Sequence, residues 1–326
     1  MLDERLLTAL ADGQFHSGQE LGALLGVSRS AVWKQMKTLE SLGVEVYSIR
    51  GRGYRIPGGL ELLCEERIAN ACSQSVVGDL QKIEVHRVLD STNLQAMREL
   101  QAGASSGQLY LAEYQTAGKG RRGRTWVSPF GRNLYFSLVW SFAAGAAGLE
   151  GLSLAVGVAL HRALTDLGLD QVALKWPNDL LANQKKLAGI LLEMRGDASG
   201  ECQVVIGVGV NVQMPDEAEE HITQPWTDLT RLVGRSVSRN QLMATVLNHL
   251  VPTLKLFAEQ GFAPFKGEWQ SLHAHQGQTV TLSSAQQEIT GVCLGVDDHG
   301  ALVIEHANGK EAFYAGEVSL RGTHAA

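Results

Sequence analysis

The first 60 residues place apolar and polar positions in a pattern that predicts three short helices and a hairpin. Ser17 followed by Glu20 forms a capping box for the second helix, and Ser28 is placed to cap the third. A short turn that contains glycine joins these two helices, which is typical of a helix-turn-helix over about residues 18–37. Alternation and a glycine turn over residues 44–56 then predict a hairpin, so the segment has the pattern of a winged helix-turn-helix.

The third helix and the hairpin are more basic than the rest of the chain. Residues 28–55 hold six basic and two acidic residues, a local charge of +4, whereas the whole chain has a formal net charge of −6. A basic face of this kind favours contact with DNA, and a small helical domain with a solvated basic face is the alternative. We expect DNA contacts from the outward-facing residues Ser28, Arg29, Ser30, Trp33, Lys34, Lys37 and Arg52.

After a linker at residues 57–59, apolar segments of both periods follow one another without a regular strand–helix alternation. We predict strands at 83–89, 109–114, 134–140, 172–176, 186–193 and 204–212, and helices at 60–77, 94–100, 152–167, 239–259 and 262–272. Short apolar runs separated by turns from about residue 277 onward predict a small antiparallel unit. The fold class is therefore α+β with three parts.

Composition sets limits on the class of protein. The 326 residues are 44% hydrophobic and 19% charged, which excludes a disordered chain and a disulfide-stapled miniprotein. The four cysteines form no C-x-x-C pair, the N-terminus has no signal-peptide pattern, and no apolar stretch is long enough to span a bilayer. We expect a cytoplasmic protein with reduced thiols and no membrane partner.

The segment from Gly118 to Trp126 contains three glycines and four cationic residues. It matches G-x-G-x-x-G literally, but the intervening residues are lysine and arginine, and Ser128-Pro129 follows instead of a helix. We therefore reject a dinucleotide fingerprint and predict a mobile loop that binds an anion such as a phosphate. A solvated basic loop is the alternative.

Further polar clusters stand at predicted strand ends, namely Ser91–Asn93, Lys175–Asp179, Lys186–Gly189 and Gly207–Asn211. Each has a simple structural explanation, such as N-capping for the first and a rim lysine for the third. The H-x-H pair of His273 and His275 has no third ligand nearby in the sequence, so we interpret it as structural rather than metal-binding.

These motifs, in this order, resemble those of biotin protein ligases, and with the N-terminal module the chain resembles the bifunctional ligases that also repress the biotin operon. The resemblance covers nearly the whole chain. It implies a winged helix-turn-helix domain at 1–60, a central mixed α/β ligase domain at 61–275 and a small C-terminal SH3-like β-barrel at 276–326.

The resemblance also implies a reaction in two steps. Biotin and Mg²⁺-ATP form biotinyl-5′-AMP and diphosphate, and a lysine of the biotin carboxyl carrier protein of acetyl-CoA carboxylase then displaces AMP. No permanently bound cofactor is implied. The other implied partners are operator DNA of biotin biosynthesis genes and a second copy of the chain, with biotinyl-5′-AMP as the corepressor that promotes the homodimer. The open alternatives are a sensor without chemistry and a lipoate-type ligase.

By the same resemblance, the biotin-binding residues are Ser91, Thr92, Asn93, Gln115, Lys119, Gly120, Arg121, Lys186 and Gly189. The residues implied for ATP and the adenylate are Arg121, Arg124, Trp126, Asn178 and Asn211. Lys186 and Arg121 are the catalytic candidates, and Asp179 either orients Lys186 or assists Mg²⁺. Glycines 189 and 207 are expected to leave room for the ligand ring. Lys119 replaces a frequent arginine of the family loop, which keeps the charge and loses the planar fork.

Overall fold

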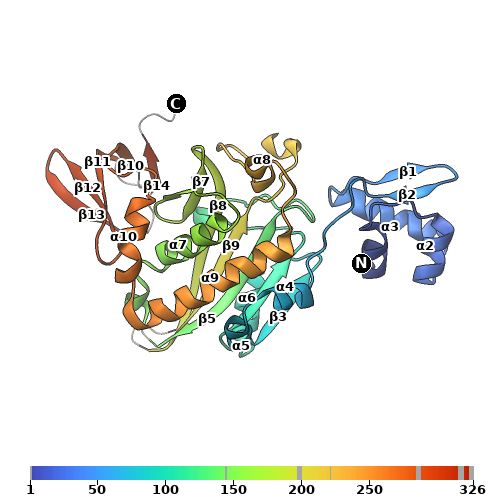
Figure 1. Cartoon of the computed structure of the whole chain (residues 1–326), viewed down its shortest axis with the longest axis horizontal. Helices are drawn as coiled ribbons and strands as arrows, with labels where there is room; N and C mark the ends of the chain where they lie inside the picture. The colour runs from blue at the N-terminus through green and yellow to red at the C-terminus, as the bar shows by residue number, and fades with distance from the viewer. Residues whose placement is uncertain are drawn as a thin grey trace.

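The structure is a computed structural model that describes residues 2–143, 145–196, 200–220, 222–283, 288–314 and 319–322. Figure 1 shows three parts in a row: a small N-terminal module at one end, a central sheet with helices, and a C-terminal sheet at the other end. An extended segment connects the N-terminal module to the centre. The predicted order of the three parts is confirmed.

The N-terminal module is a winged helix-turn-helix. Its elements are α1 (Glu4–Leu10), α2 (Gly18–Leu25), α3 (Arg29–Ser41), β1 (Tyr47–Ile49) and β2 (Gly53–Arg55). The predicted capping box is present, because Ser17 Oγ accepts the N–H of Glu20 at 3.1 Å and Glu20 Oε2 accepts the N–H of Ser17 at 2.8 Å. The first wing strand begins later than predicted, since Val44 is buried in the module's core instead of pairing in the hairpin.

The central domain is built on a seven-stranded sheet with the order β3-β4-β5-β9-β8-β7-β6. Only the β3–β4 pair is parallel among the described strands, and the other neighbours are antiparallel. The strands are β3 (Lys82–His86), β4 (Gln108–Ala112), β5 (Leu134–Phe142), β6 (Ala173–Lys175), β7 (Asp179–Ala182), β8 (Lys185–Gly196) and β9 (Cys202–Val210).

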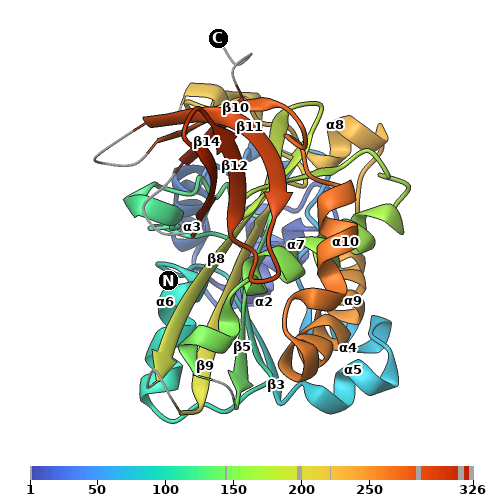
Figure 2. The same cartoon turned by 90° about the vertical axis from the view of Figure 1, so that its left-hand side faces the viewer.

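Helices cover the two faces of this sheet differently. On one face α7 (Leu152–Thr165) and α9 (Arg239–Gln260) bury the main apolar core. The other face carries α6 (Thr92–Gln101), which packs on a smaller cluster around Tyr110 and Val205. Figure 2 shows α6 and α9 on opposite sides of β5, β8 and β9. The α6 helix covers only part of its face, which leaves the middle of the sheet to the loop at residues 118–126.

Three central elements differ from the sequence prediction. The expected helix at 60–77 is two helices, α4 (Glu65–Ala71) and α5 (Gln74–Asp79), because residues 60–64 are extended and bonded to the central domain. The strand β7 and the helix α8 (Leu229–Val233) were not predicted, since four or five residues carry too little periodicity to be recognised.

The C-terminal part is an antiparallel sheet that shares its core with the central domain. The helix α10 (Ala263–Ser271) leads into β10 (Thr279–Ser283), β11 (Glu288–Val296), β12 (Leu302–His306), β13 (Gly309–Phe313) and β14 (Ser319–Gly322), in the order β13-β12-β11-β10-β14. Residues 284–287, 315–318 and 323–326 of the predicted barrel lie outside the described residues. No helix in the described part of the chain is long and apolar enough to cross a membrane.

The His273 ring is buried where the central and C-terminal parts meet. It stacks on Trp269 with ring centroids 4.5 Å apart, and its Nδ1 lies 3.8 Å from the Cys293 sulfur. Burial lowers the pKa of His273 from its usual 6.5 to about 3. Between these two values the unfolded chain binds a proton that the folded chain does not bind, so stability falls as the pH falls.

We therefore expect His273 alone to reduce the free energy of unfolding by about 2 kcal/mol between pH 7.5 and pH 5.0, at about 1.4 kcal/mol per unit below 6.5. Urea unfolding at the two pH values measures this loss. His273→Phe keeps an aromatic ring against Trp269 and removes the titration, so its loss should be smaller by that amount. An equal loss in the variant and the parent protein contradicts the assignment, and the exposed His299→Gln serves as the control.

Candidate active site

A small cavity lies on the α6 face of the central sheet, beneath the loop at residues 118–126. Its volume is about 50 Å³. The structure brings all nine residues predicted to bind biotin to its wall, together with Trp126 and Asn178: Ser91, Thr92, Asn93, Gln115, Lys119, Gly120, Arg121, Lys186 and Gly189. These residues come from four separate segments of the chain, so the motifs that the sequence places apart form one site.

A chain of polar contacts holds one end of the cavity. Gln115 Oε1 accepts hydrogen bonds from the backbone N–H of Thr92 at 2.9 Å and from its hydroxyl at 3.3 Å. Gln115 Nε2 donates to the Ser128 hydroxyl at 3.0 Å. The hydroxyl of Ser137, on the central strand β5, lies 2.8 Å from Thr92 Oγ1. The orientation of the Gln115 amide is thus fixed before any ligand arrives.

Asn93 uses its side-chain amide within the protein. Its Oδ1 accepts the Ser137 hydroxyl at 2.6 Å, and its Nδ2 donates to Glu193 Oε2 at 2.7 Å and to the Leu191 carbonyl at 3.3 Å. Neither Ser137 nor Glu193 was predicted as a site residue. The position of Ser137 in the middle of the apolar strand β5 is a sequence signal that could have identified it, because a fully buried hydroxyl needs a polar partner.

Lys186 is held at the edge of the cavity by its backbone and by its side chain. Its N–H donates to the Pro225 carbonyl at 2.9 Å, and its own carbonyl accepts the N–H of Thr227 at 3.0 Å. Its Nζ lies 2.7 Å from Asp179 Oδ1. Of the two roles considered for Asp179, the structure therefore shows the contact with Lys186. The described residues contain no group of three or more His, Cys, Asp and Glu side chains that could hold a metal.

The cationic loop lines several neighbouring spaces. Arg121 is half-buried at the small cavity and donates from Nη1 to Asn178 Oδ1 at 3.1 Å, and burial lowers the pKa of its guanidinium. Arg122 and Arg124 are exposed and line a larger neighbouring cavity of about 1150 Å³, which reaches the C-terminal part at His299. The structure thus places cationic groups at the junction of a small and a large space, where two anionic groups can be held together.

The indole of Trp126 lies over paired glycines of β8 and β9. A Cβ on Gly209 would lie 2.5 Å from the indole, and one on Gly189 would lie 3.0 Å from it. Gly207 faces the Asn93 amide, with a Cβ position 2.0 Å from Oδ1. That glycines 189 and 207 leave room for a ligand ring stays a prediction. Side chains of the protein occupy that room, and the cavity is far smaller than the usual ligand pocket of about 300–1,000 Å³.

Gly209→Ala is expected to displace the Trp126 indole, because the added methyl would overlap the ring. The loop at 118–126 then loses this anchor, and trypsin should cleave the ligand-free variant at Arg122 and Arg124 several-fold faster than the parent protein. Gly267→Ala is the control, since a Cβ there has no atom within 4 Å. Equal cleavage rates in the three proteins would show that the indole does not anchor the loop.

Of the five residues predicted for ATP, Asn211 lies apart from the other four. Asn211 lines neither cavity, because its Nδ2 donates to the carbonyls of Thr227 at 3.1 Å and Lys186 at 3.4 Å. It holds the Lys186 backbone in place. Arg124 lines the larger cavity, and it also lines a third cavity of about 120 Å³ together with Arg121, Trp126 and Asn178. The ATP roles of the predicted residues stay predictions.

The predicted DNA-contacting residues are all exposed, on α3, at its N-cap or on the wing. Trp33 is 51% exposed, and Lys37 Nζ lies 5.9 Å from the centre of its ring. The Arg52 guanidinium stacks on Phe15 at 4.4 Å, which fixes its position on the wing. Ser28 caps α3 by accepting the N–H of Ala31 at 3.3 Å, so its hydroxyl has a structural partner.

Comparison with known protein families identifies all three parts. Residues 85–211 match the model of the biotin/lipoate A/B protein ligase family, residues 4–55 match an HTH domain, and residues 275–321 match the biotin protein ligase C terminal domain. The fold and the site thus define a protein ligase of the biotin and lipoate class that carries a DNA-binding module.

Individual relatives narrow this class. The chain is 40% identical over 316 residues to the bifunctional ligase/repressor BirA of Salmonella typhimurium, which covers 97% of this chain and 96% of that protein. It is 32% identical over 315 residues to the BirA protein of Bacillus subtilis, with 96% of both chains covered. The biotin protein ligase of Aquifex aeolicus, solved with biotin and ATP, aligns with a TM-score of 0.64 and 30% identity over 75% of this chain and all of that one. The chain belongs to the biotin protein ligase family, in its bifunctional ligase/repressor form.

Proposed function

We propose that this enzyme joins biotin and ATP into biotinyl-5′-AMP and transfers the biotinyl group to a lysine of a biotin carboxyl carrier protein. The observation that carries the proposal is the convergence of Lys186, Arg121 and the polar group of Gln115, Thr92 and Ser91 on one cavity. The uncharged, prearranged hydrogen-bonding groups suit the ureido head of biotin, and the two cations suit its carboxylate and a phosphate.

The first step brings together two anions that repel each other. A carboxylate oxygen of biotin attacks the α-phosphorus of ATP. The bond from this phosphorus to the oxygen bridging to the β-phosphorus breaks, and diphosphate leaves with that oxygen and the electron pair of the bond. Lys186 and Arg121 lower the barrier by holding both anions and stabilising the charge that develops on the phosphoryl oxygens. Mg²⁺ enters as the complex with ATP and neutralises phosphate charge there. Asp179 fixes the position of Lys186 Nζ through their ion pair.

In the second step the amine of the carrier lysine attacks the carbonyl carbon of the mixed anhydride, and AMP leaves with the former carboxylate oxygen. No covalent intermediate with the enzyme is needed. The loop at 118–126 covers the adenylate and excludes water, which would otherwise hydrolyse the anhydride. The larger cavity, beside this loop, gives the carrier lysine a route to the carbonyl carbon.

We further propose that the chain represses biotin biosynthesis genes as a cytoplasmic homodimer with biotinyl-5′-AMP as corepressor. On the side of β8 that faces away from β9, strand β7 pairs with β8 only as far as Gly189. On that side the edge from Leu191 to Gly196 has no strand partner within the described residues. An open edge of this kind can pair with the same edge of a second copy. Glu193, on this edge, is bonded to Asn93 of the cavity. We propose residues 1–60, 61–275 and 276–326 as the DNA-binding, catalytic and C-terminal domains.

Ligase activity is tested by mixing the protein with a biotin carrier domain, Mg²⁺-ATP and biotin and following the acceptor by mass spectrometry. The expected result is a gain of one biotinyl group that is lost when the acceptor lysine is replaced. Tight biotin binding without any gain supports the sensor alternative. Competition between biotin and lipoate in the same assay tests the lipoate-type alternative, which predicts preferential transfer of lipoate.

Repression is tested by measuring protein binding to operator DNA with biotin and ATP present together, present singly and absent. The expected result is tight binding only when both are present, in parallel with dimer formation measured by sedimentation. Operator binding that does not depend on biotin and ATP overturns the corepressor proposal.

A further inference from the structure

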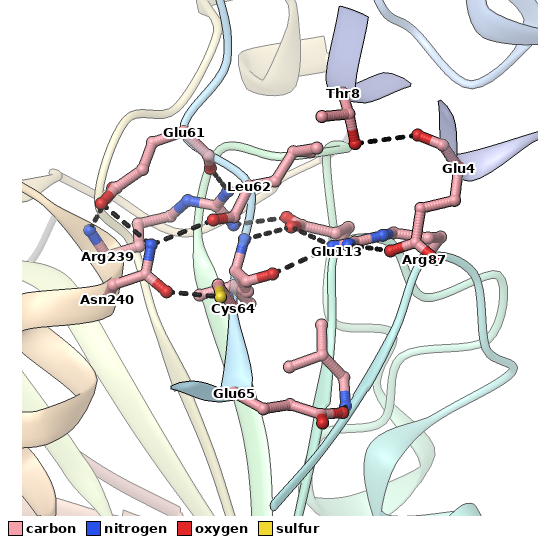
Figure 3. A network of polar contacts seen from close by, with 12 residues as sticks. Glu4, Thr8, Glu61, Leu62, Cys64, Glu65, Arg87, Glu113, Arg239 and Asn240 are labelled. Atoms are coloured by element: carbon pink, nitrogen blue, oxygen red, sulfur yellow. Dashed lines mark hydrogen bonds and ion pairs between the residues drawn. The ribbon is translucent and has the colours of Figure 1, made fainter. Parts of the chain in front are cut away.

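Arg87, just after β3, contacts three parts of the chain at once. Its Nη1 donates to the Leu63 carbonyl at 3.1 Å and to Glu113 Oε1 at 3.3 Å, and its Nη2 forms an ion pair with Glu4. Glu4 opens α1 of the DNA-binding domain, Leu63 lies in the segment that joins the two domains, and Glu113 follows β4 of the central sheet. Figure 3 shows Arg87 between Glu4 and Glu113.

The inner side of Arg87 rests on a rigid support. Glu113 is fully buried, and its carboxylate also accepts the N–H of Leu63 at 2.6 Å and Nη1 of Arg239 at 2.7 Å. Every oxygen of this buried charge therefore has a charged or N–H partner, as a stable buried ion requires. The Arg87 guanidinium thus projects from a fixed position toward the DNA-binding domain.

The joining segment is also fixed and does not behave as a flexible tether. The Glu61 carboxylate accepts the hydroxyl of Ser238 at 2.5 Å and the N–H of Arg239 at 2.6 Å, both at the start of α9. Asn240 Oδ1 accepts the N–H of Cys64 at 2.8 Å. Figure 3 shows the contacts of Glu61 and Cys64 with Arg239 and Asn240 in one network with Arg87 and Glu113. The polar contacts of residues 61–64 leave little freedom for rotation between the domains.

An apolar contact accompanies the ion pair. Phe130, which belongs to the central domain, is 3% exposed because it packs into the core of the DNA-binding domain, and Tyr114 packs against the same core. Apolar packing resists separation but sets orientation weakly, whereas an arginine held by two other groups sets direction as well.

We infer that Arg87 is a positioning residue that sets the orientation of the DNA-binding domain on the ligase domain through Glu4. The inference rests on the proposed repressor function, since the orientation matters when two recognition helices must reach half-sites about 34 Å apart on one face of the DNA. A domain that is already oriented loses less conformational freedom when it binds, so the ion pair strengthens operator binding without touching DNA.

The test replaces Glu4 with glutamine and, separately, with aspartate. Glu4→Asp keeps the negative charge at the start of α1 and shortens the side chain. The variant therefore loses the ion pair with Arg87 but keeps any stabilisation of α1 by a negative charge at its N-terminus. Both variants should bind operator DNA roughly fivefold to twentyfold more weakly as dimers, because the loss of a partly exposed ion pair acts once in each protomer. The rate of biotin transfer should stay within about twofold of the parent rate.

Glu45→Gln is the matched control, because Glu45 is exposed in the same domain and its removal changes the charge by the same amount. Arg87→Lys tests the same contact from the ligase domain. Lysine keeps the positive charge but lacks the planar fork with which arginine reaches both Glu4 and Glu113. The double variant with Glu4→Gln should bind operator no more weakly than the weaker single variant, which is the result for two residues that act through one contact.

A readout without DNA separates this inference from the repressor proposal. Hydrogen exchange at the backbone N–H of Leu60 and in α1 should be faster in both Glu4 variants and unchanged in Glu45→Gln. Unchanged exchange and unchanged operator affinity in Glu4→Asp overturn the inference. If the parent protein fails to bind operator while exchange responds as expected, the repressor proposal fails and the orienting role of Arg87 stands. Loss of binding in Glu4→Gln alone assigns the effect to the α1 dipole and also overturns the inference.

Discussion

Lys186→Ala is expected to slow the formation of biotinyl-5′-AMP by about two to three orders of magnitude with little change in stability. The side chain lies at the cavity edge with Nζ 2.7 Å from Asp179, so its removal takes away a charge that is positioned before the substrates bind. In the ground state the substrates keep Arg121 and the polar contacts of the biotin head. The effect should therefore fall mainly on the rate constant of adenylation, which release of radiolabelled diphosphate measures.

Lys185→Ala is the matched control for this prediction. Lys185 is the neighbouring residue on β8 and is exposed, so its removal changes the net charge equally without altering the cavity. We expect the control to keep the parent rate within about twofold. Near-normal adenylation in Lys186→Ala refutes the catalytic role, and an equal loss in both variants assigns the effect to general charge.

Glu113→Gln is expected to reduce the free energy of unfolding by about 3–5 kcal/mol, the largest stability effect that we predict. The variant leaves Arg239, which is 3% exposed, and Arg87 without the buried carboxylate that neutralises them. An uncompensated buried cation costs more than the lost attraction alone, because water cannot replace the missing partner. Urea unfolding followed by circular dichroism measures the change.

Glu201→Gln, at an exposed position just before β9, is expected to change stability by less than about 0.5 kcal/mol. A similarly small effect in Glu113→Gln contradicts the view that this carboxylate neutralises the buried arginines. Because the network includes residues 61–64, we also expect Glu113→Gln to expose this segment to proteases before the domain unfolds globally.

Local signals in the sequence predict the parts of the structure that depend on neighbouring residues. The Ser17–Glu20 capping box is confirmed because its bonds close within one helical turn. Polar clusters at strand ends stand out against apolar strands, but it was the resemblance to biotin protein ligases that assigned them, with Gln115, to one site, because their mutual distances depend on the whole sheet.

Contacts between distant segments were not predictable in this way. Glu193 meets Asn93 from 100 residues away, and this pairing depends on the register of β8 against the rest of the sheet. The resemblance implies a ligand role for Asn211, and the sequence does not show that carbonyls of Lys186 and Thr227 are its partners in the fold. A sequence shows that a polar group needs a partner and does not show which partner the register supplies.

The Trp126 indole over Gly189 and Gly209 acts as an internal competitor for the pocket. A ligand that needs this space binds only the protein molecules in which the indole has moved out of it. The apparent Kd therefore equals the intrinsic Kd divided by the fraction of protein molecules in that open state. A tenfold change in the internal equilibrium changes the apparent affinity tenfold without altering a single contact to the ligand. The affinity of this pocket therefore depends on how the indole packs on Gly189 and Gly209 as well as on the contacts that the ligand makes.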